Sequence, residues 1–199
     1  VEAINYAVAN GATVINASWG GFAFSQALLD SIAAASTNGV LFVAAAGNSA
    51  NDNDLVPTYP ASFDVENIVS VAATDRKDNI LWWSNFGKQT VHVGAPGTEI
   101  FSTWNGSDTD YATIEGTSMA APHVSGIAAL IFSESPSAPM AEVRERILQG
   151  AVPAESLEET TITGGRANAY SSLRAKPDGE LEVRVTPRNE TAVLVTASL

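Results

Sequence analysis

The first half of the chain alternates between two spacings of apolar residues. Residues 1–10 and 25–36 carry them at helical intervals, whereas residues 12–17, 40–46 and 67–73 are short, continuously apolar and rich in β-branched side chains. Strands that are apolar throughout are typical of a parallel sheet covered by helices on both faces. The pattern therefore predicts an α/β fold.

The second half has shorter apolar segments. We expect short strands at residues 81–86, 91–93 and 100–103, with Gly94-Ala95-Pro96-Gly97 forming a turn between the last two. Residues 141–149 carry Val143, Ile147 and Leu148 on one side and predict a helix, and a last short helix ends at Leu173.

A change of period follows residue 175. Lys176-Pro177-Asp178-Gly179 has the composition of a linker, and Leu181, Val183 and Val185 then alternate with charged residues as in a half-buried strand. Residues 187–190 are turn-like, and residues 192–195 predict a second strand. We expect one domain over residues 1–175. Residues 176–199 should form a linker and either begin a β-rich C-terminal domain or pack back onto the first domain.

One stretch carries the clearest candidate chemistry: Glu115-Gly116-Thr117-Ser118-Met119-Ala120-Ala121-Pro122-His123-Val124-Ser125-Gly126. The loop and the apolar run after it predict a buried helix with a serine at its N-terminus, capped by Thr117 or Ser118. Pro122 is expected within the first turn, and Gly126 is expected to pack closely against a neighbour. The free N–H groups of a helix N-terminus suit an anion or an oxyanion.

Composition excludes several classes of function. The 199 residues include 22 acidic and 10 basic side chains, so the net charge is −12, which argues against nucleic-acid binding. The chain has no cysteine, and therefore no disulfide or thiolate chemistry. No apolar run reaches the roughly 18 residues of a membrane span. The acidic balance is equally compatible with cation binding, with solubility and with a saline setting.

The stretch from Gly116 to Val124 resembles the nucleophile motif of the subtilisin-like serine proteases, the subtilases. The resemblance covers residues 1–175 and implies a three-layer α/β/α fold with a mostly parallel sheet, of which this chain holds the C-terminal portion. It implies that Ser118 attacks the scissile carbonyl. Ala45-Ala46-Gly47-Asn48 resembles the family's oxyanion motif, which assigns the second oxyanion donor to Asn48. An amide there favours the classical Ser-His-Asp group over the sedolisins, which use an acid.

The resemblance also implies a substrate groove. Ser18-Trp19-Gly20 resembles the strand that pairs with an extended polypeptide substrate and forms one wall of the P1 pocket, and Ala45, Ala46 and Gly47 resemble the facing wall. Such strand addition uses main-chain hydrogen bonds. Gly20 and Gly47 would let the substrate approach closely, and we expect a wide, fairly apolar pocket.

Neither histidine is expected to be the catalytic base. His123 matches the family's structural histidine within the serine motif, and His92 is typical of an ordinary strand residue. The family's catalytic Asp and His motifs precede the region that residues 1–20 resemble, so we expect them in an N-terminal part of the same protein. The fragment alone should be inactive and prone to self-association through an exposed apolar sheet edge. A propeptide partner and a secreted or cell-envelope location are further implications.

Calcium is a possible structural cofactor, although the chemistry itself requires none. Subtilases often bind Ca²⁺, and one weaker site uses backbone carbonyls near a loop like Tyr59-Pro60-Ala61, which assigns candidate ligands to Tyr59 and Ala61. Asp52, Asp54 and Asp64 add oxygens nearby, but a solvated loop explains these residues better than a calcium site does. Ca²⁺ takes six to eight oxygens.

Other interpretations stay open for the serine motif. Ser118 could be a capping residue on a structural helix, and the groove could belong to a pseudoprotease that binds peptides without hydrolysing them. An ordinary α/β-hydrolase does not fit, because the residues around Ser118 do not follow Gly-x-Ser-x-Gly.

Overall fold

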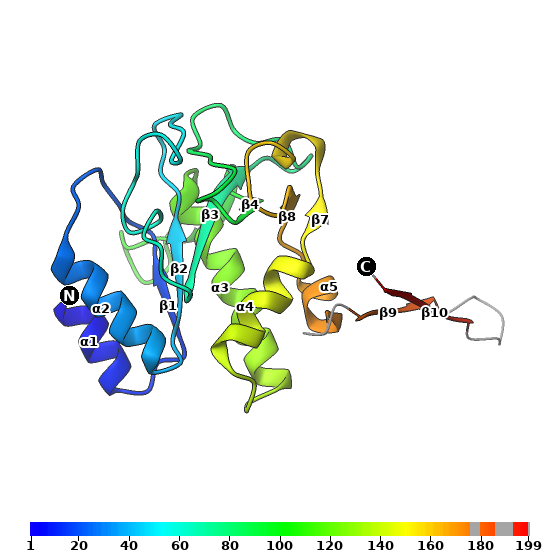
Figure 1. The fold of residues 1–199 in the computed structure, drawn as a ribbon. Coiled ribbons are helices and arrows are strands. Elements are labelled where there is room, and N and C mark those ends of the chain that lie inside the picture. The colour runs from blue at the N-terminus through cyan, green and yellow to red at the C-terminus, as the bar shows by residue number, and fades with distance from the viewer. Residues whose placement is uncertain (176–179, 186–192, 199) are drawn as a thin grey trace.

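The structure is a computed structural model that describes residues 1–175, 180–185 and 193–198. Its centre is a six-stranded sheet in the order β1-β2-β3-β4-β8-β7 (Figure 1). The strands β1 to β4 and β8 run parallel and β7 is antiparallel to β8. Their bounds are Val14–Ala17, Leu41–Ala45, Ile68–Thr74, Val93–Pro96, Gly165–Arg166 and Val152–Pro153 in that spatial order.

Helices cover both faces of this sheet, which confirms the three-layer α/β/α fold (Figure 1). Alternate residues of β2 point to opposite sides, as a strand requires. Phe42 and Ala44 pack with α1 (Glu2–Ala9) and α2 (Gln26–Thr37). Leu41, Val43 and Ala45 pack with α3 (Thr117–Glu134) and α4 (Met140–Gln149). A 3₁₀ turn, η1 (Glu155–Leu157), lies between β7 and β8, and helix α5 (Ala169–Arg174) follows β8.

Two expectations about short strands were wrong. Residues 81–86 form turns, because Ser84 and Asn85 bind neighbouring strand ends through their side chains instead of extending a ladder. The strand expected at residues 91–93 begins only at Val93, and the turn expected at residues 94–97 is the rest of strand β4 and the residue after it. A Cβ on Gly94 would lie 2.6 Å from Leu157 Cδ1, so this glycine serves close packing and not a turn.

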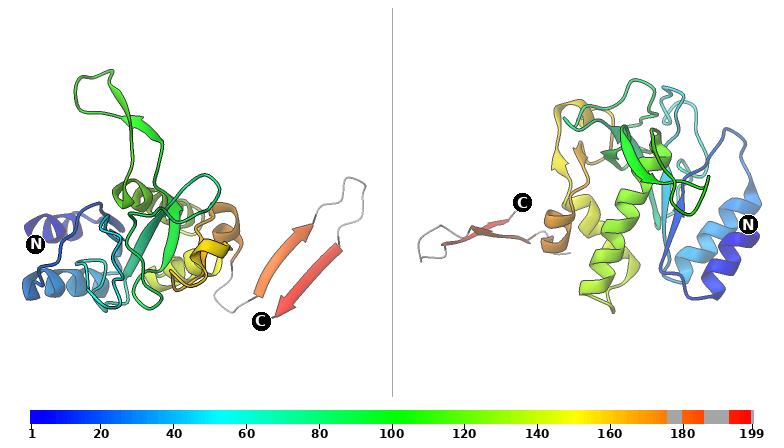
Figure 2. Two further views of the ribbon diagram at one scale, coloured as in Figure 1. Left: turned by 90° about the horizontal axis from the view of Figure 1, so that it is seen from above. Right: turned by 180° about the vertical axis from the view of Figure 1, so that it is seen from behind.

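The structure has a second sheet of two strands, of which the sequence predicted only the first. The expected strand is β5 (Ile100–Thr103), and its antiparallel partner is β6 (Tyr111–Ile114), which the sequence pattern did not indicate. This hairpin extends away from the main sheet (Figure 2). Phe101 and Tyr111 stack across it with ring centroids 5.2 Å apart.

The C-terminal residues form a third sheet. Strands β9 (Glu180–Val185) and β10 (Val193–Ser198) pair antiparallel. The sequence pattern predicted the two strands but not their pairing. The expected linker at residues 176–179 and turn at residues 187–190 lie outside the described residues. Whether residues 176–199 are a separate unit stays a prediction. Within the part of the chain that the structure describes, no helix is long and apolar enough to cross a membrane.

Helix α3 was predicted to be buried on all sides, but the structure buries only one side of it. The side facing β1 to β4 is buried, including Ala121, Val124 and Ala128. The opposite side is open: Leu130 is 50% exposed, and nothing lies within 4 Å of a Cβ built on Gly126. The expectation that Gly126 packs against a neighbour was therefore wrong for this chain.

Candidate active site

The candidate site lies where the carboxyl ends of β1 and β2 meet the N-terminus of α3. Parallel sheets place their sites at this edge, because the loops that leave the strands converge there. Ser18 follows β1, Asn48 follows β2, and Ser118 is the second residue of α3. The chain thus brings together three residues that are 30 and 70 positions apart in sequence.

The amide of Asn48 has a defined direction. Its Oδ1 accepts hydrogen bonds from Thr117 N at 2.9 Å and from Thr117 Oγ1 at 2.8 Å. Because both donors hold the oxygen, the Nδ2 group is the one left to face the site, where it lies 3.4 Å from a Cβ built on Gly116.

Asn48 therefore caps α3, where the sequence suggested Thr117 or Ser118. Gly116 is the N-cap residue and contributes no side-chain cap. Thr117 Oγ1 also accepts from Gly47 N at 3.1 Å, so the threonine ties the end of β2 to the helix. Among the hydrogen bonds of the described residues, none uses the N–H of Ser118, which leaves that amide available.

Ser118 and Ser18 hold each other by two hydrogen bonds. Ser118 Oγ donates to the Ser18 carbonyl at 3.0 Å, and Ser18 Oγ donates to the Ser118 carbonyl at 2.7 Å. The second bond exists because Pro122, four residues further along α3, has no N–H to donate to that carbonyl. Pro122 is thus beyond the first turn, contrary to expectation, and Ser18 satisfies the acceptor it leaves open.

The pocket beside Ser118 has a volume of about 280 Å³. A second pocket, of about 310 Å³, lies beside Ala61 and Arg144 and does not include Ser118. Ser118 and Asn48 line the first pocket together with four of the six predicted wall residues. Ala46 does not, since its side chain is buried against Ala72 and Val91, and Ser18 contacts Ser118 instead. The lining residues are Trp19, Gly20, Gly21, Phe22, Ala45, Gly47, Asn48, Ser49, Thr58, Asn85, Thr117 and Ser118.

Thr58 and Asn85 make this pocket more polar than expected, and sequence reasoning missed both. Asn85 donates to the carbonyl of Ala46, to Asn53 Oδ1 and to Thr58 Oγ1, and accepts from Ser49 N. A Cβ on Gly47 would lie 2.3 Å from Asn85 Nδ2. The glycine therefore makes room for the protein's own asparagine. No sequence motif marked this contact, because the two residues are 38 positions apart.

The wall formed by residues 18–20 offers free main-chain groups. Residues 18–20 lie outside strand β1, and among the described residues no backbone hydrogen bond uses Trp19 or Gly20. Pairing with the rest of the protein resumes at Gly21, which exchanges two hydrogen bonds with Tyr59. An extended peptide could add to residues 18–20 as a strand.

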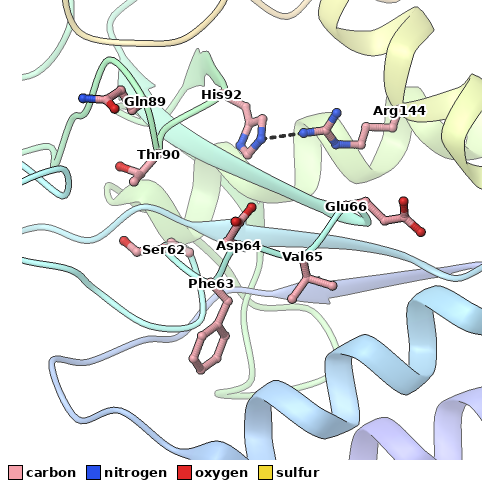
Figure 3. A pocket seen from close by; sticks show the side chains of 10 residues that line it. Ser62, Phe63, Asp64, Val65, Glu66, Gln89, Thr90, His92 and Arg144 are labelled. Atoms are coloured by element: carbon pink, nitrogen blue, oxygen red, sulfur yellow. Dashed lines mark hydrogen bonds between the residues drawn. The ribbon is translucent and has the colours of Figure 1, made fainter.

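Neither histidine is placed to take the proton of Ser118. His123 Nδ1 donates to the Met119 carbonyl at 2.9 Å, and five residues along a helix turn it by about 140° from Ser118. His92 immediately precedes β4, at the amino edge of the parallel sheet, whereas the site lies at the carboxyl edge. Figure 3 shows the imidazole of His92 directed towards Arg144. Burial, followed by the charge of Arg144, lowers the pKa of His92 to about 3.

The surroundings of Tyr59 and Ala61 do not fit a calcium ion. Ala61 lines the 310 Å³ pocket, but the guanidinium of Arg144 lies in the same pocket (Figure 3). Tyr59 uses its N–H and its carbonyl to pair with Gly21. Over the residues described, no group of three or more His, Cys, Asp or Glu side chains could hold a metal. We derive no catalytic step through calcium.

Comparison with known proteins places this geometry in a family. The model of the subtilase family matches residues 1–179. Thermitase from Thermoactinomyces vulgaris is 39% identical over 171 residues, which are 86% of this chain and 57% of the relative. Subtilisin-like protease 2 from Plasmodium falciparum is 37% identical over 181 residues, 87% of this chain and 13% of the relative. The chain thus spans less than two thirds of these relatives.

Solved structures agree with the sequence comparison. The prenylagaramide maturation protease PagA matches with a TM-score of 0.75 and 29% identity over 86% of this chain and 64% of its own. The patellamide maturation protease PatA matches with a TM-score of 0.75 and 32% identity over 86% and 65%. The family model, these relatives and the arrangement of Ser118 and Asn48 lead to one assignment: the chain belongs to the subtilase family of serine proteases.

Proposed function

We propose that this chain carries the nucleophile and the oxyanion donors of a serine endopeptidase that works through an acyl-enzyme. The observation that carries the proposal is the amide of Asn48. Thr117 holds its oxygen, so its Nδ2 group faces the pocket that Ser118 also lines. A structural capping asparagine would need only the oxygen.

In the proposed reaction, Ser118 Oγ attacks the carbonyl carbon of the scissile peptide bond while its proton passes to a general base. The carbonyl oxygen becomes an oxyanion, which Asn48 Nδ2 and the N–H of Ser118 stabilise. The C–N bond then breaks, the base returns the proton to the leaving amine, and water hydrolyses the acyl ester by the same steps.

The base must come from outside these 199 residues, because both histidines of the chain are accounted for elsewhere in the fold. We assign the base and its orienting acid to an N-terminal part of the same protein, as the family resemblance implies. A propeptide and a secreted or cell-envelope setting follow from the same resemblance.

The proposed substrates are extended polypeptides. The free main-chain groups of Trp19 and Gly20 would pair with residues before the scissile bond, and the side chain next to that bond would enter the 280 Å³ pocket. Main-chain pairing tolerates many substrate sequences, which suits an endopeptidase.

A peptide-binding pseudoprotease is the second candidate. One observation favours it: Ser118 Oγ donates to the Ser18 carbonyl and not to a base, while residues of this chain form the pocket beside it. A binding module would need the groove alone.

A peptide-hydrolysis assay separates the two. We expect no turnover from the 199-residue chain, and serine-dependent turnover from the full-length protein that disappears in Ser118→Ala. Peptide binding by the full-length protein without any turnover would overturn the endopeptidase and support the pseudoprotease.

A further inference from the structure

A second pocket lies at the opposite edge of the sheet from Ser118. It has a volume of about 310 Å³ and is formed by residues 61–66, residues 89–90, His92 and Arg144. Figure 3 shows the imidazole of His92 and the guanidinium of Arg144 meeting end to end above the loop. This is the loop to which the family resemblance assigns a weak calcium site.

Arg144 reaches the pocket from α4 and is anchored there. Its Nε donates to the carbonyl of Ile68 at 3.1 Å, at the end of the loop. Burial lowers the pKa of Arg144, while Glu66 and Glu145 raise it, and a guanidinium stays charged in proteins. Among the ion pairs of the described residues, none joins Arg144 to a carboxylate. A fixed positive charge therefore stays in the pocket.

His92 leaves no nitrogen open to a metal. Ser70 N donates to its Nδ1 at 3.0 Å, and Arg144 Nη2 lies 2.7 Å from its Nε2. The remaining side-chain candidates are the carboxylates of Asp64 and Glu66, both on exposed residues. Their side chains alone fall short of the six to eight oxygens that Ca²⁺ takes, so main-chain carbonyls of the loop would have to complete the set. The guanidinium beside them repels a divalent cation from that position.

We propose that the guanidinium of Arg144 is the resident cation of this pocket, and that it stabilises the loop of residues 59–68 without calcium. The arginine binds the Ile68 carbonyl, as a metal ion would bind a main-chain oxygen. The proposal is independent of catalysis, because it concerns the far edge of the sheet.

Thermal unfolding of the 199-residue chain in excess EDTA and in millimolar Ca²⁺ tests this, together with calcium calorimetry. The wild type should show the same Tm in both buffers and no saturable heat. Arg144→Gln should lower the Tm equally in both. The double variant His92→Asp, Arg144→Gln loses the guanidinium and adds a carboxylate to those of Asp64 and Glu66. Calcium should therefore raise the Tm of this double variant by several degrees.

Arg76→Gln is the matched control, since Arg76 is an exposed arginine whose side chain is 77% accessible; its Tm should stay close to that of the wild type. If Arg144→Gln fails to fold, Arg144→Lys replaces it in the test. This variant keeps the positive charge, so its Tm should be the same in EDTA and in Ca²⁺. Calcium binding by the wild type that is lost in the Asp64→Asn, Glu66→Gln double variant would overturn the proposal. So would an Arg144→Gln variant as stable as the wild type.

Discussion

Asn48 shows how the direction of one amide group can determine what a site is able to do. Its oxygen is held by Thr117, so the substitution Asn48→Asp keeps the acceptor and removes the donor. In the full-length protein we expect kcat to fall by about 10²–10³, the usual effect of losing an oxyanion donor. KM and the Tm should change little.

Steady-state kinetics on a peptide substrate check this, with Asn105→Ala as the control because Asn105 lies in the exposed β5–β6 turn. An Asn48→Asp enzyme with full kcat would remove Asn48 from the proposed mechanism.

Ser18 supports Ser118 by a hydrogen bond to the main chain of that residue. Ser18→Ala removes the 2.7 Å hydrogen bond to the carbonyl that Pro122 leaves open. The free energy of unfolding should fall by about 1 kcal/mol, as for an average hydrogen bond. Ser133→Ala, at an exposed position of α3, should change it by less. Urea unfolding measures both, and equal effects of the two substitutions would argue against this role for Ser18.

His92 should make the chain sensitive to acid. Its pKa is about 3 in the folded state against 6.5 in the unfolded state, so the unfolded state binds more protons between these two values. The free energy of unfolding should therefore decrease as the pH falls from about 6.5 towards 3, by at most about 1.4 kcal/mol per pH unit from this group. Denaturant unfolding of the wild type and of His92→Gln across that range should show a shallower decrease in the variant.

Among the elements, α3 offers the clearest stability test. Nothing in this chain lies near Gly126, and glycine is worse than alanine in a helix by about 1 kcal/mol. Gly126→Ala should therefore raise the free energy of unfolding of the 199-residue chain by about that amount. Ala129→Gly, also exposed on α3, should lower it by a similar amount. A destabilising Gly126→Ala would mean that a neighbour covers this position.

The elements also show which features a sequence can reveal. The buried strands β2 and β3 and the helices α2 and α4 follow from apolar periodicity alone, because each one buries a whole face or both faces. Strand β4 was taken for a turn, since Gly94 and Pro96 resemble turn residues until Leu157, 63 positions later, packs on the glycine. Strand β6 was missed because the hairpin is exposed and carries little apolar pattern.

The same limit applies to the site. Ser118 and Asn48 were found because each lies in a contiguous motif. Asn85 and Thr58 complete the pocket through contacts made only in the folded chain, so no local pattern marked them. Arg144 likewise reaches the candidate calcium loop from a helix more than 80 residues later in the chain.

For the whole molecule, the open surfaces predict association. Strand β1 is an edge of the six-stranded sheet, and Leu130 is 50% exposed on the uncovered side of α3. The 199-residue chain should form oligomers in light scattering. Leu130→Lys should reduce them, whereas Ala33→Lys on exposed α2 should not. A clean wild-type monomer would contradict this expectation.

The central claim is that Ser118 is a nucleophile. An organophosphonate that modifies activated serines, followed by peptide mass spectrometry of the full-length protein, tests it most directly. The proposal predicts one covalent adduct, on Ser118, together with loss of peptide hydrolysis and no adduct in Ser118→Ala. Peptide hydrolysis that persists in Ser118→Ala, or an inactivating adduct on another residue, would contradict it.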